Sequence, residues 1–272
     1  MTQETGKRAF PTGFASSVED RSRIFRLDGR RALVIGAGAG IGRESAWALA
    51  AQGAEVICAD RDALLAAETA AQIGAESLTI DVTDRVTIRQ APSVHGDLDI
   101  VVLTPAYSVK KRIALVSDEE FDAMSDVNFR ATFDVLRAFG PPMVERRHGS
   151  IIAMSSIRAS VVEPGQGIYA ATKAAIIQLV RGAASEWGPS GVRVNAIASG
   201  VVETPMTAPL RADRPRHATY AAHTALERWA QPSELAGAVA FLASDAASFV
   251  TGSAMVVDGG WSAIDGRYDP PD

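Results

Sequence analysis

The sequence predicts an α/β protein built on one doubly wound parallel sheet of about seven strands, with helices on both faces. Strand-like apolar runs alternate along the chain with amphipathic helical stretches. These runs are continuously apolar, which is typical of strands buried on both faces. No linker, repeat or low-complexity segment interrupts residues 25–262. Strands and helices that alternate in one uninterrupted region favour a parallel sheet with right-handed crossovers.

The expected elements follow in order along the chain. Strands are predicted over 31–38, 54–60, 76–82, 98–106, 149–156, 192–200 and 254–260. Helices are predicted over 43–53, 62–74, 231–244 and from 167 to about 187, with one or two more within 118–146. Gly53 is a stop signal for the first helix, and Pro232 and Glu234 mark the start of the last one.

Composition places the chain among ordinary globular proteins. It has 272 residues, of which 47% are hydrophobic and 22% charged, and its net charge is −5. This mild acidic balance does not support binding to nucleic acid or a membrane surface, which usually shows clustered basic charge. Cys58 is the single cysteine, so no intrachain disulfide is possible, which is consistent with a reducing cytoplasm. No apolar run reaches the roughly 18 residues of a membrane span.

The N-terminal residues 1–24 are polar and lack the apolar core of a signal peptide. We interpret them as a flexible extension, and an arm that contacts another subunit is the alternative. Residues 25–272 are interpreted as a single domain.

A glycine-rich loop joins the first predicted strand to the first predicted helix. Gly36, Gly40 and Gly42 occur in "IGAGAGIGRE", and Asp60 ends the next strand, 24 residues after Gly36. Glycines permit positive φ and close backbone approach, and a helix N-terminus offers unpaired N–H groups to a pyrophosphate. A carboxylate at this distance accepts hydrogen bonds from ribose hydroxyls. The pattern predicts a dinucleotide site, with a purely structural turn as the alternative.

Asp60 also indicates which dinucleotide is bound. Its carboxylate would accept a hydrogen bond from the 2′-OH of NAD and repel the 2′-phosphate of NADP. Ala37, Gly38 and Ala39 bring no basic side chain to the loop, although Arg61 follows Asp60 and could reach such a phosphate. We therefore expect NAD, with NADP less favoured.

Tyr169 and Lys173 lie four residues apart in the predicted helix that begins "GIYAATKAAIIQLV". Residues at this spacing share one helix face, and a nearby cation lowers the pKa of a phenol from about 10. Such a tyrosine can exchange a proton with an alcohol or carbonyl near neutral pH. Ser156 ends the preceding strand, where its hydroxyl would face the crevice at the carboxyl edge of the sheet. A surface Tyr–Lys pair is the alternative for these two residues taken alone.

Together these motifs resemble the short-chain dehydrogenase/reductase family. The resemblance covers about residues 27–262 and rests on "GAGAGIG", "DVTD", "DVNFRATF", "SS", "YAATK", "SGVVETPM" and "VTGSAMVVDGG". It implies a Rossmann-like fold and an NAD-dependent enzyme that interconverts a small secondary alcohol and its ketone. It also implies a homotetramer built on the helices around 118–140 and 169–187 and on the last strand. We expect the enzyme to be cytoplasmic.

The resemblance also implies roles for individual residues. Tyr169 matches the general acid/base, Lys173 the lysine that binds the nicotinamide ribose and lowers the tyrosine pKa, and Ser156 the serine that hydrogen-bonds the substrate oxygen. Asn128 matches the helix asparagine whose carbonyl holds a water in a proton relay. The implied cofactor contacts are Gly36, Gly40, Ile41, Gly42, Asp60, Arg61, Asp81, Val82, Ala106, Val202 and Thr204, together with Tyr169 and Lys173.

The loop "TPAY", residues 104–107, departs from the Asn-Asn-Ala-Gly that the family usually has. Ala106 is kept, but Pro105 has no N–H, and Tyr107 brings a side chain where the family has none. We expect either a tolerated variant or an altered cofactor geometry with weak activity. Ser199 stands where the family usually has a proline, which lowers the rigidity beside the nicotinamide.

Substrate contacts are expected from a mobile lid over residues 204–231 and from the wall candidates Arg158, Val162, Glu163, Tyr107 and Ser108. Arg158 binds an anionic or polyol substrate in one interpretation and is a solvated rim residue in the other. His217 and His223 have no neighbouring cluster of metal ligands in the sequence, so we interpret them as surface residues and predict no metal site.

Two other functions stay open beside the alcohol dehydrogenase. One is an NADP-dependent reductase of the 3-oxoacyl type, against which Asp60 argues. The other is a non-catalytic NAD-binding scaffold, which the loop 104–107 suggests and which the intact Ser156, Tyr169 and Lys173 oppose.

Overall fold

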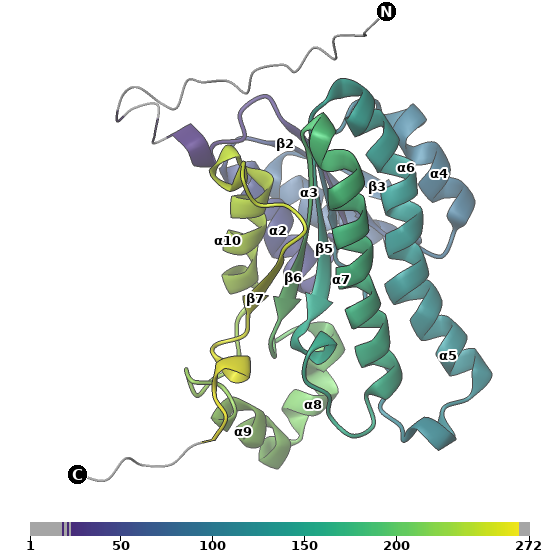
Figure 1. The fold of residues 1–272 in the computed structure, drawn as a ribbon, viewed down its shortest axis with the longest axis vertical. Coiled ribbons are helices and arrows are strands. Elements are labelled where there is room, and N and C mark those ends of the chain that lie inside the picture. The colour runs from purple at the N-terminus through teal and green to yellow at the C-terminus, as the bar shows by residue number, and fades with distance from the viewer. Residues whose placement is uncertain (1–17, 19–20, 22, 267–272) are drawn as a thin grey trace, which may run out of the picture.

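The computed structural model describes residues 18, 21 and 23–266, and its seven strands form one sheet (Figure 1). The strand order is β3-β2-β1-β4-β5-β6-β7. The strands are β1 (Arg31–Ile35), β2 (Glu55–Asp60), β3 (Glu76–Thr79), β4 (Ile100–Leu103), β5 (Gly149–Ser156), β6 (Val192–Ser199) and β7 (Ala254–Val257). Every neighbouring pair is parallel, so the predicted doubly wound, Rossmann-like sheet is confirmed.

Helices cover both faces of the sheet, as Figure 1 shows. One face carries α2 (Gly40–Ala51), α3 (Ala63–Ile73) and α10 (Pro232–Ala243), and the other carries α4 (Arg85–His95), α6 (Ala131–Arg146) and α7 (Gly167–Trp187). Two hydrophobic cores result, because successive residues of a strand point to opposite faces. In β1, Ala32 and Val34 join the core beneath α2 and α10, whereas Leu33 and Ile35 join the core beneath α4, α6 and α7.

The helix α4 occupies a region to which the sequence analysis assigns no element. Pro92 lies inside this helix, where a proline removes a hydrogen bond and crowds the preceding turn. The side chains of Ile88 and Ala91 are nevertheless buried, and Asp84 caps the helix by accepting hydrogen bonds from two backbone N–H groups. Burial and capping therefore outweigh the cost of the proline.

The predicted helical region 118–146 contains three segments. The helix α5 (Asp118–Met124) starts with a capping box between Ser117 and Glu120 and runs into a π-helical segment, Ser125–Arg130, before α6. π-helical turns are frequent at functional sites. This segment holds Asn128, whose side chain is turned into the protein and is 1% exposed.

The carboxyl ends of the strands define where a ligand can bind. The strand order reverses between β1 and β4, and such a switch point leaves a crevice outside the carboxyl ends. The last residues of β1, β2, β4, β5 and β6 are Ile35, Asp60, Leu103, Ser156 and Ser199. The glycine loop, Asp60 and Ser156 therefore belong to the same edge. The helices α8 (Ala208–Ala212) and α9 (Arg214–Ala222) lie beyond this edge (Figure 1).

The predicted N-terminal extension, residues 1–24, lies outside the described residues except for positions 18, 21, 23 and 24. In the part of the chain that the structure describes, no helix is both long enough and apolar enough to cross a membrane.

Candidate active site

The glycine loop leaves β1 and opens α2. Gly36 has a φ of +88°, and the N–H groups of Gly36 and Ala37 donate to the Ala59 carbonyl oxygen at 2.8 and 2.9 Å. A β-carbon added at Gly42 would lie 1.9 Å from the Gly36 carbonyl oxygen, so only glycine fits there. Ala39, the N-cap of α2, provides no side-chain cap. The first N–H groups of α2 are therefore available to a pyrophosphate, and the loop fits a dinucleotide.

Asp60 contacts the glycine loop directly. Its carboxylate accepts hydrogen bonds from the N–H groups of Gly38 at 2.9 Å and Asp62 at 3.0 Å. A β-carbon added at Gly38 would lie 2.8 Å from a carboxylate oxygen of Asp60. The structure thus brings the loop and the acid together, as the spacing predicted. Arg61 is exposed.

Arg43 is a basic residue at this loop that the sequence analysis missed. Its Nη2 donates to the Gly38 carbonyl oxygen at 2.8 Å, and its Nε is buried without a hydrogen-bond partner. Arg43 lies outside the loop in the sequence and reaches back to it from the first turn of α2. The loop residues Ala37, Gly38 and Ala39 carry no basic side chain, but the helix brings one to the loop.

The unusual loop 104–107 is held by hydrogen bonds on both sides. The Thr104 hydroxyl donates to the carbonyl oxygens of Ile35 at 3.0 Å and Gly36 at 3.3 Å, which ties the end of β4 to the end of β1. The Asn128 amide pairs with the Tyr107 backbone, accepting from its N–H at 2.9 Å and donating to its carbonyl at 2.8 Å. These bonds fix the loop even though its proline lacks an N–H.

Ser156, Tyr169 and Lys173 come together from β5 and α7. All three are buried, with exposed fractions of 7%, 8% and 1%. Because α7 begins at Gly167, Tyr169 and Lys173 occupy its first two turns. Lys173 Nζ donates to the Met154 carbonyl oxygen at 2.8 Å and lies 5.6 Å from the centroid of the Tyr169 ring. The alternative of an exposed surface pair is therefore wrong.

Burial shifts the pKa of both residues in α7. It raises the pKa of Tyr169 to about 12, although a hydrogen bond with Ser156 and the nearby Arg158 guanidinium both act to lower it. It lowers the pKa of Lys173 to about 7. The net shift of the Tyr169 pKa is upward, opposite to the lowering expected from a nearby cation, because loss of hydration outweighs the effects of Ser156 and Arg158.

The pKa of Lys173 predicts a pH-dependent stability. Its folded value of about 7 lies below the ordinary 10.5, so between these values the unfolded chain binds more protons and stability rises with pH. Relative to Lys173→Met, the wild type should gain on the order of 3 kcal/mol between about pH 7 and pH 10. Urea denaturation of both proteins across this range measures the gain. A difference in stability that does not change with pH contradicts the prediction.

Asn128 links the π-helical segment to α7. Its Nδ2 donates to Thr172 Oγ1 at 3.1 Å, in addition to its bonds with the loop after β4. Its backbone carbonyl accepts a hydrogen bond from Thr132 Oγ1 at 2.8 Å. The sequence analysis expected this carbonyl to hold a water, and Thr132 takes one of its two lone pairs. The side chain positions the loop and α7.

A cavity of about 330 Å³ lies at Ser156 and Tyr169, a size at the lower end for small-molecule sites. Its lining includes Ser108, Lys110, Ser156, Arg158, Tyr169 and Tyr220.

The predicted substrate residues differ in their relation to this cavity. Arg158 is only 7% exposed, so its interpretation as a solvated rim residue is wrong. Val162 is 64% exposed and does not line the cavity, contrary to the prediction. Glu163 does not line the cavity either, contrary to the prediction, and its carboxylate accepts a hydrogen bond from Arg158 Nη2 at 2.7 Å.

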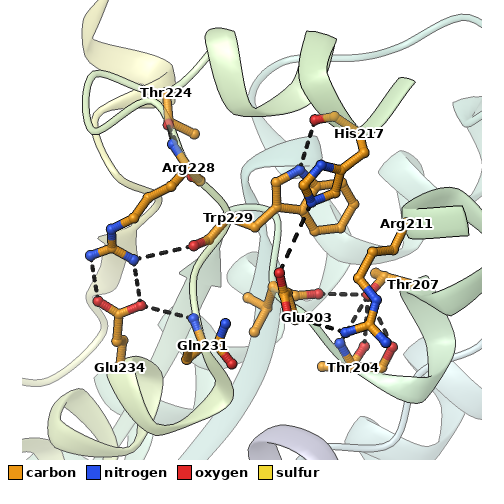
Figure 2. A network of polar contacts seen from close by, with 11 residues as sticks. Glu203, Thr204, Thr207, Arg211, His217, Thr224, Arg228, Trp229, Gln231 and Glu234 are labelled. Atoms are coloured by element: carbon orange, nitrogen blue, oxygen red, sulfur yellow. Dashed lines mark hydrogen bonds and ion pairs between the residues drawn. The ribbon is translucent and has the colours of Figure 1, made fainter. Parts of the chain in front are cut away.

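The predicted lid, residues 204–231, forms α8 and α9 beside the cavity and is tied to the strand edge (Figure 2). The Thr207 hydroxyl donates to the Val202 carbonyl oxygen at 2.6 Å, and Arg211 pairs with Glu203 at 3.1 Å. These contacts join the start of the lid to the segment that follows β6.

An aromatic contact holds the other end of the lid. Trp229 is 3% exposed, and its Nε1 donates to the His217 carbonyl oxygen at 3.0 Å while the two rings stack at 4.9 Å (Figure 2). His217 is therefore half-buried, unlike the predicted surface residue, whereas His223 is exposed and stacks on Trp261. Among the described residues, no group of three or more His, Cys, Asp or Glu is arranged to hold a metal ion.

The remaining predicted cofactor contacts lie around the same edge. A β-carbon added at Gly40 would lie 3.2 Å from Thr204 Cγ2, so Thr204 is adjacent to the glycine loop. Val202 follows β6 and is 4% exposed. Asp81 and Val82 follow β3, Ile41 lies in the first turn of α2, and Ala106 lies in the loop after β4.

Comparison with known proteins decides the family. Residues 36–262 match a family model described as enoyl-(acyl carrier protein) reductase. Galactitol 2-dehydrogenase (L-tagatose-forming) from Cereibacter sphaeroides is 38% identical over 251 residues, which cover 89% of this chain and 99% of that protein. The chain belongs to the short-chain dehydrogenase/reductase family.

Other members of this family extend the comparison. Gluconate 5-dehydrogenase from Gluconobacter oxydans is 35% identical, over 87% of this chain and 96% of that protein. The structure of a gluconate 5-dehydrogenase from Burkholderia cenocepacia in complex with NADP and tartrate has a TM-score of 0.85 and 33% identity, and covers 89% of this chain and 98% of that one. As a short-chain dehydrogenase/reductase, the protein is an oxidoreductase that binds a nicotinamide cofactor and acts on a small molecule.

Proposed function

We propose that the protein transfers a hydride between a nicotinamide cofactor and a secondary alcohol or ketone on a small polyhydroxylated molecule, with Tyr169 as general acid/base. One observation carries the proposal: Ser156 and Tyr169 line the same cavity, and Lys173 lies beside the Tyr169 ring. Relatives that are dehydrogenases of galactitol, gluconate and threitol support the substrate class.

Each residue of the site has a separate part in the reaction. When bound, the nicotinamide supplies or accepts the hydride. Ser156 Oγ hydrogen-bonds the substrate oxygen and aligns it with Tyr169 Oη, which takes up or returns the hydroxyl proton. Arg158 places a positive charge near the phenol, which favours the phenolate, and Lys173, beside the Tyr169 ring, would bind the nicotinamide ribose. Asn128 positions the site by holding α7 and the loop after β4.

The proposed cofactor is NAD. The loop at Gly36, Gly40 and Gly42 would hold the pyrophosphate, and Asp60 would accept hydrogen bonds from the adenosine ribose. NADP is the alternative, because Arg43 lies at the same loop and several related structures contain NADP. The negative charge of Asp60 against Gly38 favours NAD.

Replacing Asp60 with alanine tests the cofactor assignment. The Kd for NADH should rise about 10- to 150-fold, because a hydrogen bond to a charged group is lost. Titration of NADH and NADPH fluorescence with each protein measures this change. Glu55→Ala is a matched control, since Glu55 is an exposed acid at the opposite end of β2. A wild type that prefers NADPH, and loses that preference in Arg43→Met, would reverse the assignment.

A turnover screen separates the dehydrogenase from its alternatives. Reduction of NAD is followed with matched alditols and aldonates, and oxidation of NADPH is followed with a 3-oxoacyl thioester. Turnover of a polyhydroxylated substrate supports the proposal. Turnover of the thioester alone favours the 3-oxoacyl-type reductase, and NADH binding without any turnover favours the scaffold.

The homotetramer and the cytoplasmic location stay predictions. Exposed aromatic side chains on α5 and α6 and in the segment between them support an assembly through these elements. They are Phe121, Phe129 and Phe133, with exposed fractions of 48%, 38% and 37%.

A further inference from the structure

One wall of the cavity carries two cations that share a single carboxylate. Arg158 Nη2 lies 2.7 Å from Glu163 Oε2, and Lys110 Nζ lies 3.8 Å from Glu163 Oε1. The Lys110 ammonium also donates to the Tyr220 hydroxyl at 3.3 Å. Arg158 and Lys110 line the cavity, whereas Glu163 does not. One carboxylate balances only one of these two cations. Arg216 and Asp213 also line the cavity, and they pair with each other at 3.5 Å. The charged groups at the cavity therefore leave about one net positive charge.

The Arg158 guanidinium is shielded from solvent and has hydrogen-bond donors available for a ligand. Its side chain is 9% exposed, and its guanidinium lies 5.2 Å from the Trp261 ring centroid and 5.9 Å from that of Tyr220. A guanidinium has five N–H donors, and the Arg158 side chain makes one hydrogen bond, to Glu163. A buried charge with spare donors is costly unless a partner of opposite charge joins it.

Ser108 gives a second, independent sign of a ligand at this place. Its Oγ is buried and has no hydrogen-bond partner, although it lines the same cavity as Ser156 and Tyr169. A buried hydroxyl without a partner is unfavourable by about 1–3 kcal/mol. A ligand oxygen in the cavity would satisfy it.

We propose that Arg158 and Lys110 bind the carboxylate of the substrate, so that the substrate is a small polyhydroxy acid and not a neutral polyol. This inference rests on the proposed dehydrogenase function and specifies its substrate. A carboxylate matches the single net positive charge of the wall and the planar donor fork of Arg158, whereas a dianionic phosphate would exceed that charge. Ser108 then bonds a substrate oxygen near the carboxylate, and Ser156 and Tyr169 receive the alcohol that is oxidised.

The test compares matched acids and alditols in binding and in turnover. Calorimetric titrations with threonate and threitol, and with gluconate and glucitol, are made on the full-length protein with and without saturating NADH. NAD reduction is measured with the same four compounds. The variants are Arg158→Gln and Lys110→Met. Lys111→Met is the control, because Lys111 is the next residue, pairs with Glu120 and does not line the cavity.

The expected result is that the acid of each pair binds more tightly than its alditol to the wild type. Arg158→Gln should weaken acid binding about 10- to 150-fold, since a charge-assisted contact is lost. Lys110→Met should weaken acid binding about 2- to 5-fold, because a half-exposed ion pair contributes less. This second variant keeps the test valid if Arg158→Gln does not fold. Alditol binding should change little in either variant, and Lys111→Met should match the wild type.

The outcomes separate this inference from the proposed function. Acids that bind through Arg158 and Lys110 but are never oxidised would overturn the dehydrogenase proposal and leave the carboxylate site standing. If alditols are oxidised while acids bind no more tightly than alditols, the dehydrogenase proposal stands and the carboxylate site is overturned. Failure of every acid to bind, or an acid preference unchanged in both variants, overturns the inference.

Discussion

Tyr169→Phe is expected to lower kcat by about 10²- to 10⁴-fold, the usual contribution of a positioned acid/base group. The substitution removes only the hydroxyl, so the buried ring still packs beside Lys173. Without that hydroxyl, the site has no group beside Ser156 to take up the substrate proton. The Kd for NADH should change far less than kcat. Steady-state kinetics with the preferred polyhydroxylated substrate and NADH titration measure the two quantities.

Tyr107→Phe is the matched control for this prediction. Tyr107 is 42% exposed, does not line the cavity, and contacts Asn128 through its backbone, so loss of its hydroxyl should leave kcat near the wild-type value. A Tyr169→Phe enzyme with wild-type kcat would refute the assigned role. An equal loss in both variants would show that the effect does not depend on the position of the hydroxyl.

Gly42→Ala should destabilise the folded protein by at least about 3 kcal/mol, the upper range for an overpacked core. The added carbon would lie 1.9 Å from the Gly36 carbonyl oxygen and 2.7 Å from Thr104 Oγ1. The carbonyl is backbone and cannot swing aside as a flexible side chain can. Relief of the clash has to move the glycine loop, so NADH binding should be lost as well. Urea denaturation and NADH titration measure the two effects.

Gly182→Ala provides the comparison. Gly182 lies within α7, and nothing lies within 4 Å of a β-carbon added there. Alanine favours a helix over glycine by up to about 1 kcal/mol, so this variant should be as stable as the wild type or more so. If Gly42→Ala unfolds at the same urea concentration as Gly182→Ala and still binds NADH, the close packing of the loop contributes neither to folding stability nor to NADH binding.

Local patterns of the sequence determined the sheet and the order of its elements. The predicted strand 149–156 coincides with β5, and the predicted helix 62–74 contains α3 with Asp62 as its cap. Continuous apolar runs, caps and glycine stops act over a few residues, so they can be interpreted without tertiary information. The predicted strand 98–106 extends three residues beyond Leu103, where β4 ends and the loop with Thr104 and Pro105 begins.

The helix α4 shows where local patterns fail. Pro92 and polar neighbours oppose a helix, and the burial of Ile88 and Ala91 that compensates depends on the rest of the fold. Propensity is a weak prior that tertiary packing often overrides. No helix is predicted here because of the proline, although Asp84 is a local N-cap signal for one.

The sequence by itself determined the fold class, the glycine loop with Asp60, and the grouping of Ser156, Tyr169 and Lys173, because each follows from a short motif and the parallel order of strands. Only the tertiary structure decided what surrounds these motifs. It placed Arg43 at the glycine loop, decided that Arg158 is buried in the cavity wall and not a solvated rim residue, excluded Val162 from that wall, and left Ser108 Oγ without a partner. It also reversed the expected pKa shift of Tyr169. These properties depend on burial and on contacts between distant segments, and no local pattern of residues carries that information.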